Sequence, residues 1–117
     1  MLKILFVCAQ NRLRSPTAEQ VFAHWPGVET ASAGINRDAS VPVSPELLAW
    51  ADLVFVMERR QRSKLSHKFR PQLRGKRIIC LDIPDDFDYM DEGLVHLLNA
   101  RVPRHLPAAR TMATSST

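Results

Sequence analysis

An apolar run that ends in a cysteine and leads straight into a loop and a helix start constrains this chain most. Residues 4–7 read Ile-Leu-Phe-Val, and residues 8–16 continue as Cys-Ala-Gln-Asn-Arg-Leu-Arg-Ser-Pro. A short apolar run of this kind is typical of a buried strand, whereas Ser-Pro is typical of a helix N-terminus. The stretch therefore predicts a strand, a tight loop and a helix in direct succession.

The loop between this strand and this helix has the composition of an anion-binding site. Backbone N–H groups of a curled loop and of a helix N-terminus bind oxyanions, and Asn11 tolerates the left-handed backbone that such curling requires. The same donors would stabilise a thiolate at Cys8, and Arg14 would grip two phosphate oxygens with its planar guanidinium. These residues predict phosphoryl transfer through a cysteinyl-phosphate intermediate.

Ser15 has two roles open to it in this site. Its hydroxyl can cap the first helix, since Ser is a favoured N-cap and Pro16 suits the first helical turn. Alternatively, the hydroxyl can donate a hydrogen bond to the Cys8 thiolate and stabilise its charge. The residue pattern leaves both roles open.

Apolar runs alternate with helical patterns along the rest of the chain. We expect strands at 2–7, 28–33, 53–57 and 77–81, and helices at about 15–24, 45–50, 59–68 and 91–102. This alternation predicts an α/β fold with a doubly wound, four-stranded parallel sheet, in a flavodoxin-like three-layer sandwich. We expect one domain over residues 1–102 and, from the Pro-, Ala-, Ser- and Thr-rich composition, a disordered tail over residues 103–117.

The CX5R motif at residues 8–14, followed by Ser-Pro, resembles the phosphate-binding loop of the low-molecular-weight protein tyrosine phosphatases. Three further stretches are similar to that family, at residues 32–34 (Ser-Ala-Gly), 51–58 and 83–87 (Ile-Pro-Asp-Asp-Phe). The resemblance spans most of residues 1–90. It implies the phosphotyrosine phosphatase I-like sandwich and a cytoplasmic, cofactor-free protein tyrosine phosphatase. The implied substrates are phosphorylated proteins or small aryl phosphates.

The resemblance also implies roles for single residues. Cys8 would be the nucleophile and Arg14 the phosphate clamp, and matching residues 83–87 to the family's Asp-Pro-Tyr-like segment makes Asp85 the general acid and base. Asp85 follows the fourth strand, so it faces the same crevice as Cys8 despite a separation of 77 positions. Asp86, which stands where the family has proline, and Asp88 are rival acids. The substrate-binding residues would be Ala9, Gln10, Asn11, Arg12, Leu13 and Ser15.

Several departures mark the chain as a shortened relative of that family. Gln10 stands where the family has Gly, and Leu13 stands where it often has a second cysteine, so a protective disulfide within the loop is excluded. Arg12 adds a cation that either meets a second anionic group of the substrate or is simply solvated. The link at residues 35–50 is short, so we expect a shallower pocket, or one completed by a second copy in a homodimer.

Charge is distributed unevenly along the chain, whose formal net charge is +4. Nine of the sixteen basic residues lie at 59–77, and six of the twelve acidic residues lie at 82–92. The basic segment has Phe69 as its one aromatic residue and no recognition motif, so we interpret it as a solvated helix rather than a nucleic-acid site. The four histidines lack metal-ligand spacing, and no run is long enough for a membrane span.

Three other functions stay open as alternatives. The loop could bind phosphate or a phosphorylated protein with little turnover. Arsenate reduction on the same loop would require two further cysteines, and only Cys80 remains, in a strand where we expect it to be a buried core residue. Nucleic-acid binding would use the basic helix, above all Arg59, Arg60 and Arg62.

Overall fold

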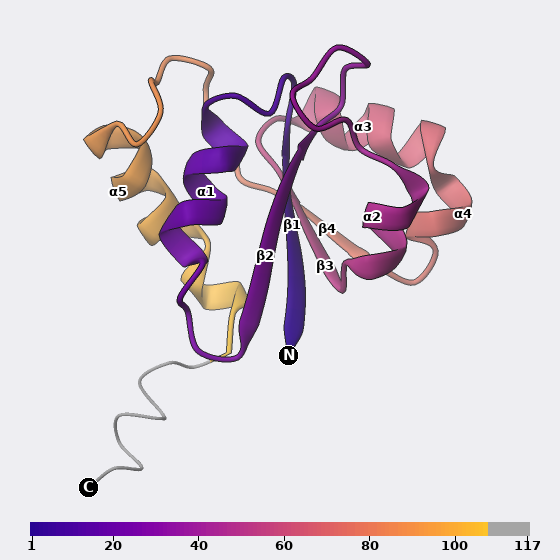
Figure 1. The fold of residues 1–117 in the computed structure, drawn as a ribbon, viewed down its shortest axis with the longest axis horizontal. Coiled ribbons are helices and arrows are strands. Elements are labelled where there is room, and N and C mark those ends of the chain that lie inside the picture. The colour runs from indigo at the N-terminus through magenta and orange to yellow at the C-terminus, as the bar shows by residue number, and fades with distance from the viewer. Residues whose placement is uncertain (108–117) are drawn as a thin grey trace, which may run out of the picture.

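The computed structural model describes residues 1–107 and contains a four-stranded parallel sheet between two layers of helices (Figure 1). The strands follow the order β2-β1-β3-β4, and every neighbouring pair is parallel. Their bounds are β1 Leu2–Cys8, β2 Val28–Gly34, β3 Leu53–Val56 and β4 Arg77–Cys80. This topology confirms the predicted doubly wound sandwich.

The helices lie on both faces of the sheet because each connection between parallel strands must cross over it. Figure 1 shows α1 and α5 on one side, and α2, α3 and α4 on the other. The bounds are α1 Arg14–Phe22, α2 Pro45–Trp50, α3 Arg59–Lys68, α4 Arg70–Leu73 and α5 Glu92–Arg101. No described helix is both long and apolar enough to cross a membrane.

Alternation along β1 divides the core into two apolar clusters, one on each face of the sheet. Ile4, Phe6 and Cys8 belong to the cluster beneath α1 and α5, whereas Leu5 and Val7 belong to the cluster beneath the other three helices. All of these side chains are buried. The period of two therefore places the Cys8 side chain on the α1 side of the sheet, where the first helix begins.

Helix starts follow the capping rules at two of the predicted positions. Ser44 caps α2 by accepting a hydrogen bond from the Leu47 amide at 3.1 Å, and Asp91 caps α5 by accepting one from the Gly93 amide at 2.8 Å. The first helix differs, because α1 begins at Arg14 with no side-chain cap and places Ser15 inside its first turn. The Ser15 hydroxyl is thus available to the loop that joins β1 to α1.

The predicted disordered tail differs from the structure in its first residues. Pro103–His105 forms a 3-10 helix, η1, and Leu106 packs against the cluster beneath α1 and α5. The His105 ring meets Phe55 edge-on with 5.7 Å between centroids, and burial lowers the pKa of His105. These contacts pack His105 and Leu106 against the core, and the Trp25 Nε1 donates to the Pro107 carbonyl at 3.0 Å. Residues 108–117 of the predicted tail lie outside the described part of the chain.

Candidate active site

The loop from Cys8 to Arg14 leaves the end of β1 and curls into the start of α1. Asn11 has a φ of 56°, the left-handed conformation expected for it, and its backbone N–H donates to the Cys8 Sγ at 3.2 Å. A left-handed residue next to a right-handed one can turn neighbouring N–H groups toward one centre. The loop thus directs the Asn11 N–H at the thiol.

Gly34, at the end of β2, supports this loop from behind. A Cβ atom at this position would lie 2.8 Å from the Ala9 carbonyl oxygen and 2.9 Å from the Asn11 nitrogen, so no side chain fits without moving the loop. The next residues then pair with it, because the Ile35 and Asn36 amides donate to the carbonyls of Cys8 and Ala9. The Ser-Ala-Gly stretch at residues 32–34 is therefore part of the site's scaffold.

The Cys8 thiol lies in a polar setting although its residue is only 3% exposed. Its Sγ is 2.9 Å from the Ser15 Oγ, and the Asn11 Nδ2 donates to that same oxygen at 3.0 Å. Since the hydroxyl accepts from Asn11, its own proton can be donated, either to the sulfur or to the Ala33 carbonyl at 3.3 Å. Of the two roles open to Ser15, the structure favours hydrogen bonding to the sulfur over helix capping.

Arg14 is held by three acceptors from distant parts of the chain. Its Nη1 donates to the Ile83 carbonyl at 2.9 Å and lies 3.5 Å from the Glu58 Oε2, and its Nε lies 3.6 Å from the Asp85 Oδ1. The Arg14 side chain is 3% exposed and that of Glu58 is 23% exposed, so water screens this ion pair less than the pair with Asp85. The guanidinium is thereby oriented before any substrate arrives.

Glu58 and the Ile83 carbonyl are the site groups to which sequence analysis gave no role. Glu58 follows the buried strand β3, and Gln61 fixes it by accepting from the Met57 and Glu58 amides, each at 3.0 Å. An acidic residue directly after a parallel strand was the available signal, because the carboxyl ends of such strands meet at one edge. No side-chain pattern marks the carbonyl of Ile83.

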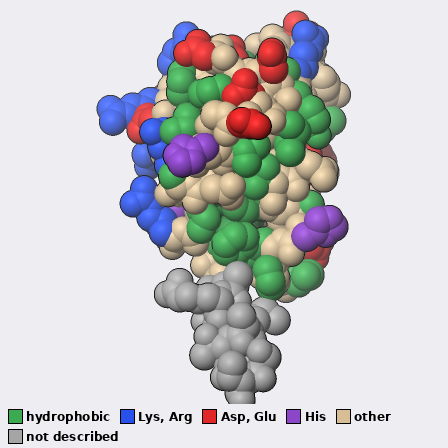
Figure 2. Space-filling model, turned by 90° about the vertical axis from the view of Figure 1, so that its left-hand side faces the viewer, with side chains coloured by type: hydrophobic (Ala, Val, Ile, Leu, Met, Phe, Trp, Pro, Cys, Tyr) green, Lys and Arg blue, Asp and Glu red, His purple; other side chains and the backbone are tan. Residues whose placement is uncertain are grey.

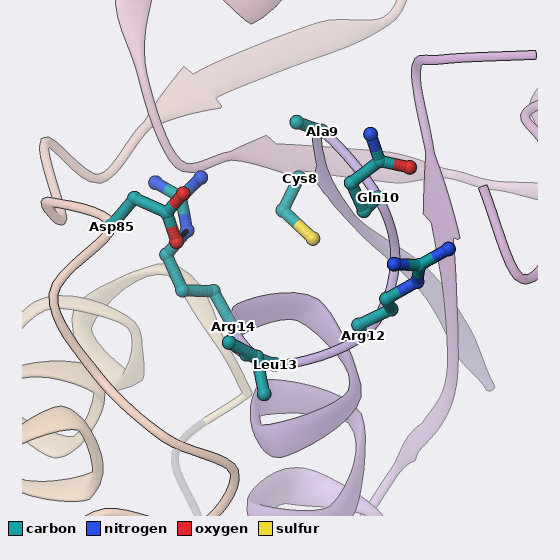
Figure 3. A pocket seen from close by; sticks show the side chains of 7 residues that line it. All are labelled: Cys8, Ala9, Gln10, Arg12, Leu13, Arg14 and Asp85. Carbon is teal, nitrogen blue, oxygen red and sulfur yellow. Dashed lines mark ion pairs between the residues drawn. The ribbon is translucent and has the colours of Figure 1, made fainter. Parts of the chain in front are cut away.

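Asp85 and the loop from Cys8 to Arg14 line a small cavity of about 210 Å³ at the carboxyl edge of the sheet. Figure 3 shows Asp85 and Arg14 on one side of the Cys8 sulfur, and Gln10 and Arg12 on the other. The lining residues are Cys8, Ala9, Gln10, Arg12, Leu13, Arg14 and Asp85. The structure thus brings together the three residues for which catalytic roles are predicted.

The remaining predicted site residues divide into two groups. Ala9, Gln10, Arg12 and Leu13 line the cavity, whereas Asn11 and Ser15 are buried behind the thiol and support it. The Gln10 Oε1 is buried and has no hydrogen-bond partner within residues 1–107. In Figure 3 the Gln10 amide points away from the sulfur, so this side chain leaves the centre of the loop free.

Of the three candidate acids, Asp85 alone lines the cavity. Asp86 and Asp88 are exposed on the same segment and take no part in the lining. The Asp85 side chain is 65% exposed, so its ion pair with Arg14 is open to solvent. Nearby, Phe87 packs against the core and Tyr89 is exposed, and neither contributes to the wall of the cavity.

The second cysteine differs from its predicted place in the core. Cys80 ends β4, which pairs only with β3 among the described strands, and the open edge leaves its side chain partly exposed. Its Sγ donates to the Asp82 Oδ1 at 3.4 Å. Burial, although incomplete, raises the pKa of the Cys80 thiol. Cys80 lines a different cavity from Cys8, together with Arg101, Arg104 and other residues.

No protein-family model and no curated protein matches the sequence, but solved structures share its fold. Over 96% of this chain and 98% of the other, the structure resembles SP-PTP, a low-molecular-weight protein tyrosine phosphatase from Streptococcus pyogenes, with a TM-score of 0.76 and 17% identity. The YwlE arginine phosphatase from Geobacillus stearothermophilus matches with a TM-score of 0.74 and 22% identity, over 98% and 95% of the chains.

A third solved structure is the Wzb protein of Vibrio vulnificus in complex with benzylphosphonate. It matches with a TM-score of 0.66 and 26% identity, over 97% of this chain and 98% of its own. The fold is therefore that of the low-molecular-weight protein tyrosine phosphatases, as the resemblance in sequence predicts.

Proposed function

We propose that this protein is a cysteine-dependent phosphomonoesterase of the protein tyrosine phosphatase type. The observation that carries the proposal is the position of the Cys8 Sγ, 3.2 Å from the Asn11 amide and 2.9 Å from the Ser15 hydroxyl, in a cavity shared with Arg14 and Asp85. Nucleophile, phosphate clamp and acid are the three parts that phosphoryl transfer to a thiolate needs. The phosphatases that share the fold support this reading.

In the first step, the Cys8 thiolate attacks the phosphorus atom of a bound phosphomonoester. Arg14 and the loop amides stabilise the charge that develops on the three equatorial oxygens. The sulfur–phosphorus bond forms as the bond from phosphorus to the ester oxygen breaks, and Asp85 donates its proton to the departing oxygen. The products are an alcohol or phenol and a cysteinyl-phosphate at Cys8.

In the second step, water releases the phosphate from Cys8. The Asp85 carboxylate takes a proton from the water as its oxygen bonds to phosphorus, and the sulfur leaves as a thiolate. Hydrogen bonds from Ser15 and the Asn11 amide stabilise that leaving thiolate. The cycle returns the enzyme with inorganic phosphate as the second product and requires no other reactant.

The positive charge of Arg12 favours an aryl phosphate, such as phosphotyrosine, over phosphoarginine as the substrate. Its side chain lines the cavity in addition to Arg14, so the rim carries a second positive charge. A substrate whose leaving group is itself basic would meet like charge there, whereas a phenol does not. We therefore propose phosphotyrosine in proteins, and small aryl phosphates, as the substrate class.

The arsenate reductase alternative is disfavoured by the position of the second thiol. Such a reaction would pass oxidation from Cys8 to other cysteines. Cys80 is the one other cysteine of the chain, and it lines a separate cavity at the far edge of the sheet. It thus has no direct approach to the Cys8 sulfur.

Rapid-quench trapping tests the proposal. Wild type and the Asp85→Ala, Asp86→Ala and Asp88→Ala variants are mixed with 32P-labelled p-nitrophenyl phosphate, whose leaving group departs without a proton. We expect phospho-Cys8 to accumulate in Asp85→Ala alone, because that variant lacks the base for hydrolysis. Turnover without a phosphocysteine would contradict the mechanism, and vanadate binding with no turnover would identify a binding module instead.

A further inference from the structure

A second cavity lies beside the phosphate-binding loop and has no part in the chemistry proposed above. It has a volume of about 550 Å³ and lies between the segment that follows β2 and one face of α3. We call it the basic side cavity. Its lining residues are Ile35, Asn36, Arg37, Lys64, His67 and Lys68.

The basic side cavity is joined to the active-site loop by backbone hydrogen bonds. The Ile35 amide donates to the Cys8 carbonyl at 2.9 Å, and the Asn36 amide donates to the Ala9 carbonyl at 3.0 Å. One wall of the side cavity is therefore bonded directly to the wall of the active-site cavity. A chain that places a phosphate on the loop has this second cavity within a few residues' reach, since an extended peptide advances about 3.3 Å per residue.

Positive charge converges on the side cavity from two separate elements. Arg37 comes from the segment after β2, and Lys64 and Lys68 lie one helical turn apart on α3. All three are exposed, none makes an ion pair within residues 1–107, and no carboxylate lines the cavity. The charges are thus available to an anionic group of a ligand.

The opposite side of the active site carries the opposite charge. Residues 82–92 hold six carboxylates and lead into α5, on the other face of the sheet from α3. Figure 2 shows acidic side chains gathered at the upper end of that face. A peptide bound across the active site would therefore meet cations on one flank and carboxylates on the other. This asymmetry would favour one orientation of the peptide chain over the reverse.

We propose that the basic side cavity binds acidic side chains flanking the phosphorylated residue of a protein substrate, on one flank only. The proposal rests on the proposed function and narrows its substrate class to phosphotyrosine in an acidic sequence. The cavity is concave, and its lining residues include no Phe, Tyr or Trp on which a base could stack. Charge complementarity to carboxylates, beside a site for a phosphate, favours a peptide over a nucleic acid.

Three phosphotyrosine peptides test this inference. One has neutral flanks, one has three Glu residues on the N-terminal flank only, and one has three Glu residues on the C-terminal flank only. We expect one acidic peptide, and not the other, to have a kcat/KM about tenfold above that of the neutral peptide, mainly through KM, since the contact is made equally in ground and transition states. The preference should weaken with added salt.

Charge-reversal variants assign the effect to the cavity. Lys64→Glu/Lys68→Glu should abolish the preference and leave p-nitrophenyl phosphate turnover unchanged, because that substrate has no flank. Arg62→Glu/Arg70→Glu is the matched control, since it makes the same change of charge at two exposed positions that do not line the side cavity. The control should retain the preference.

Each other outcome overturns the inference. Equal gains on both flanks, or equal losses in the two double variants, would show long-range steering rather than a binding cavity. RNA and the acidic peptide can also be compared as inhibitors of p-nitrophenyl phosphate turnover. Stronger inhibition of wild type by an RNA oligonucleotide, lost in Lys64→Glu/Lys68→Glu, would assign the cavity to nucleic acid. Normal p-nitrophenyl phosphate turnover without a peptide preference would overturn this inference alone, whereas no turnover would overturn the proposed function as well.

Discussion

Strands β1 and β4 both end in a cysteine, and a residue with a positive φ follows each within three positions. The two segments nevertheless differ in the charge and the burial of their side chains. After β1, Cys8 is followed by Asn11 with a φ of 56°, and after β4, Cys80 is followed by Asp82 with a φ of 54°. The first segment directs the Asn11 N–H at a buried thiol and contributes the Arg14 guanidinium to the same cavity. The second presents carboxylates on an exposed strand end.

The difference arises from what covers each segment. The loop after β1 lies in the middle of the sheet, between β2 and β3, and the start of α1 and residues 35–40 enclose it. The segment after β4 leaves an edge strand, so its carboxylates meet water although Leu81 and Ile83 are buried. Enclosure makes hydrogen-bond donors strong and orients them in advance, whereas exposure leaves a carboxylate free to exchange protons. The proposed reaction uses both conditions.

The largest expected effect separates the two cysteines. Cys8→Ser should lower kcat for p-nitrophenyl phosphate by roughly four powers of ten or more, because it removes the nucleophile. Cys80→Ser should leave kcat within about twofold. Steady-state assays check both, with circular dichroism to show that each variant is folded. Activity that persists in Cys8→Ser would contradict the proposal that Cys8, unlike Cys80, is the nucleophile.

The next effect lies within the acidic segment. Asp85→Asn should lower kcat by about two to four powers of ten with phenyl phosphate, whose leaving group needs a proton, and by less with p-nitrophenyl phosphate. Asp86→Asn and Asp88→Asn should change it little, because neither side chain lines the cavity. A variant series in which Asp86→Asn causes the larger loss would move the acid role to that residue.

Alkylation compares the two thiols directly. At pH 7 iodoacetate should modify Cys8 about tenfold faster than Cys80, because burial raises the pKa of the Cys80 thiol and the loop around Cys8 attracts the anionic reagent. Peptide mass spectrometry measures both rates in one sample. Inorganic phosphate should protect Cys8 alone, and faster labelling of Cys80 would contradict the assignment of the anion-binding loop.

The smallest effect concerns the two left-handed residues. Asn11→Ala and Asp82→Ala should each lower the free energy of unfolding by roughly 1–2 kcal/mol, because alanine disfavours a positive φ. Only Asn11→Ala should also lower kcat, since it removes the bond from Asn11 Nδ2 to Ser15. Urea titration and steady-state kinetics separate the two effects, with Asn11→Gly as the variant that restores backbone freedom alone. Equal kinetic losses at both positions would argue against a special role for the first loop.

Much of this arrangement could be predicted from the sequence because it is local or topological. The CX5R motif at residues 8–14 holds most of the proposed anion-binding loop in one contiguous stretch. The rule that parallel strands end at the same edge placed Asp85 near Cys8, and the structure brings both to one cavity. The alternation of apolar runs with helical patterns was enough to predict the four strands and the helices α1, α2, α3 and α5 in order, but not the short helix α4.

The remainder depended on contacts that no local pattern encodes. Arg14 forms an ion pair with Glu58 and a hydrogen bond with the Ile83 carbonyl. Both depend on the register of β1, β3 and β4, which sequence analysis does not give. The partial exposure of Cys80 follows from its edge strand, and an apolar run cannot distinguish edge from centre. The contacts of residues 103–107 involve single apolar side chains without periodicity, so composition alone suggested disorder.

The hydrogen bond from Arg14 to the Ile83 carbonyl couples two segments that would otherwise be independent. The guanidinium that we propose as the phosphate clamp also binds the backbone two residues before Asp85, and the Ile83 amide is itself bonded to the Met57 carbonyl at 2.9 Å. A chimera that grafts the 82–90 segment of another phosphatase onto this scaffold would keep its carboxylate in line only if that graft preserved the same backbone anchor. In the proposed mechanism, phosphate binding by Arg14 and proton transfer by Asp85 therefore depend on the same hydrogen bond.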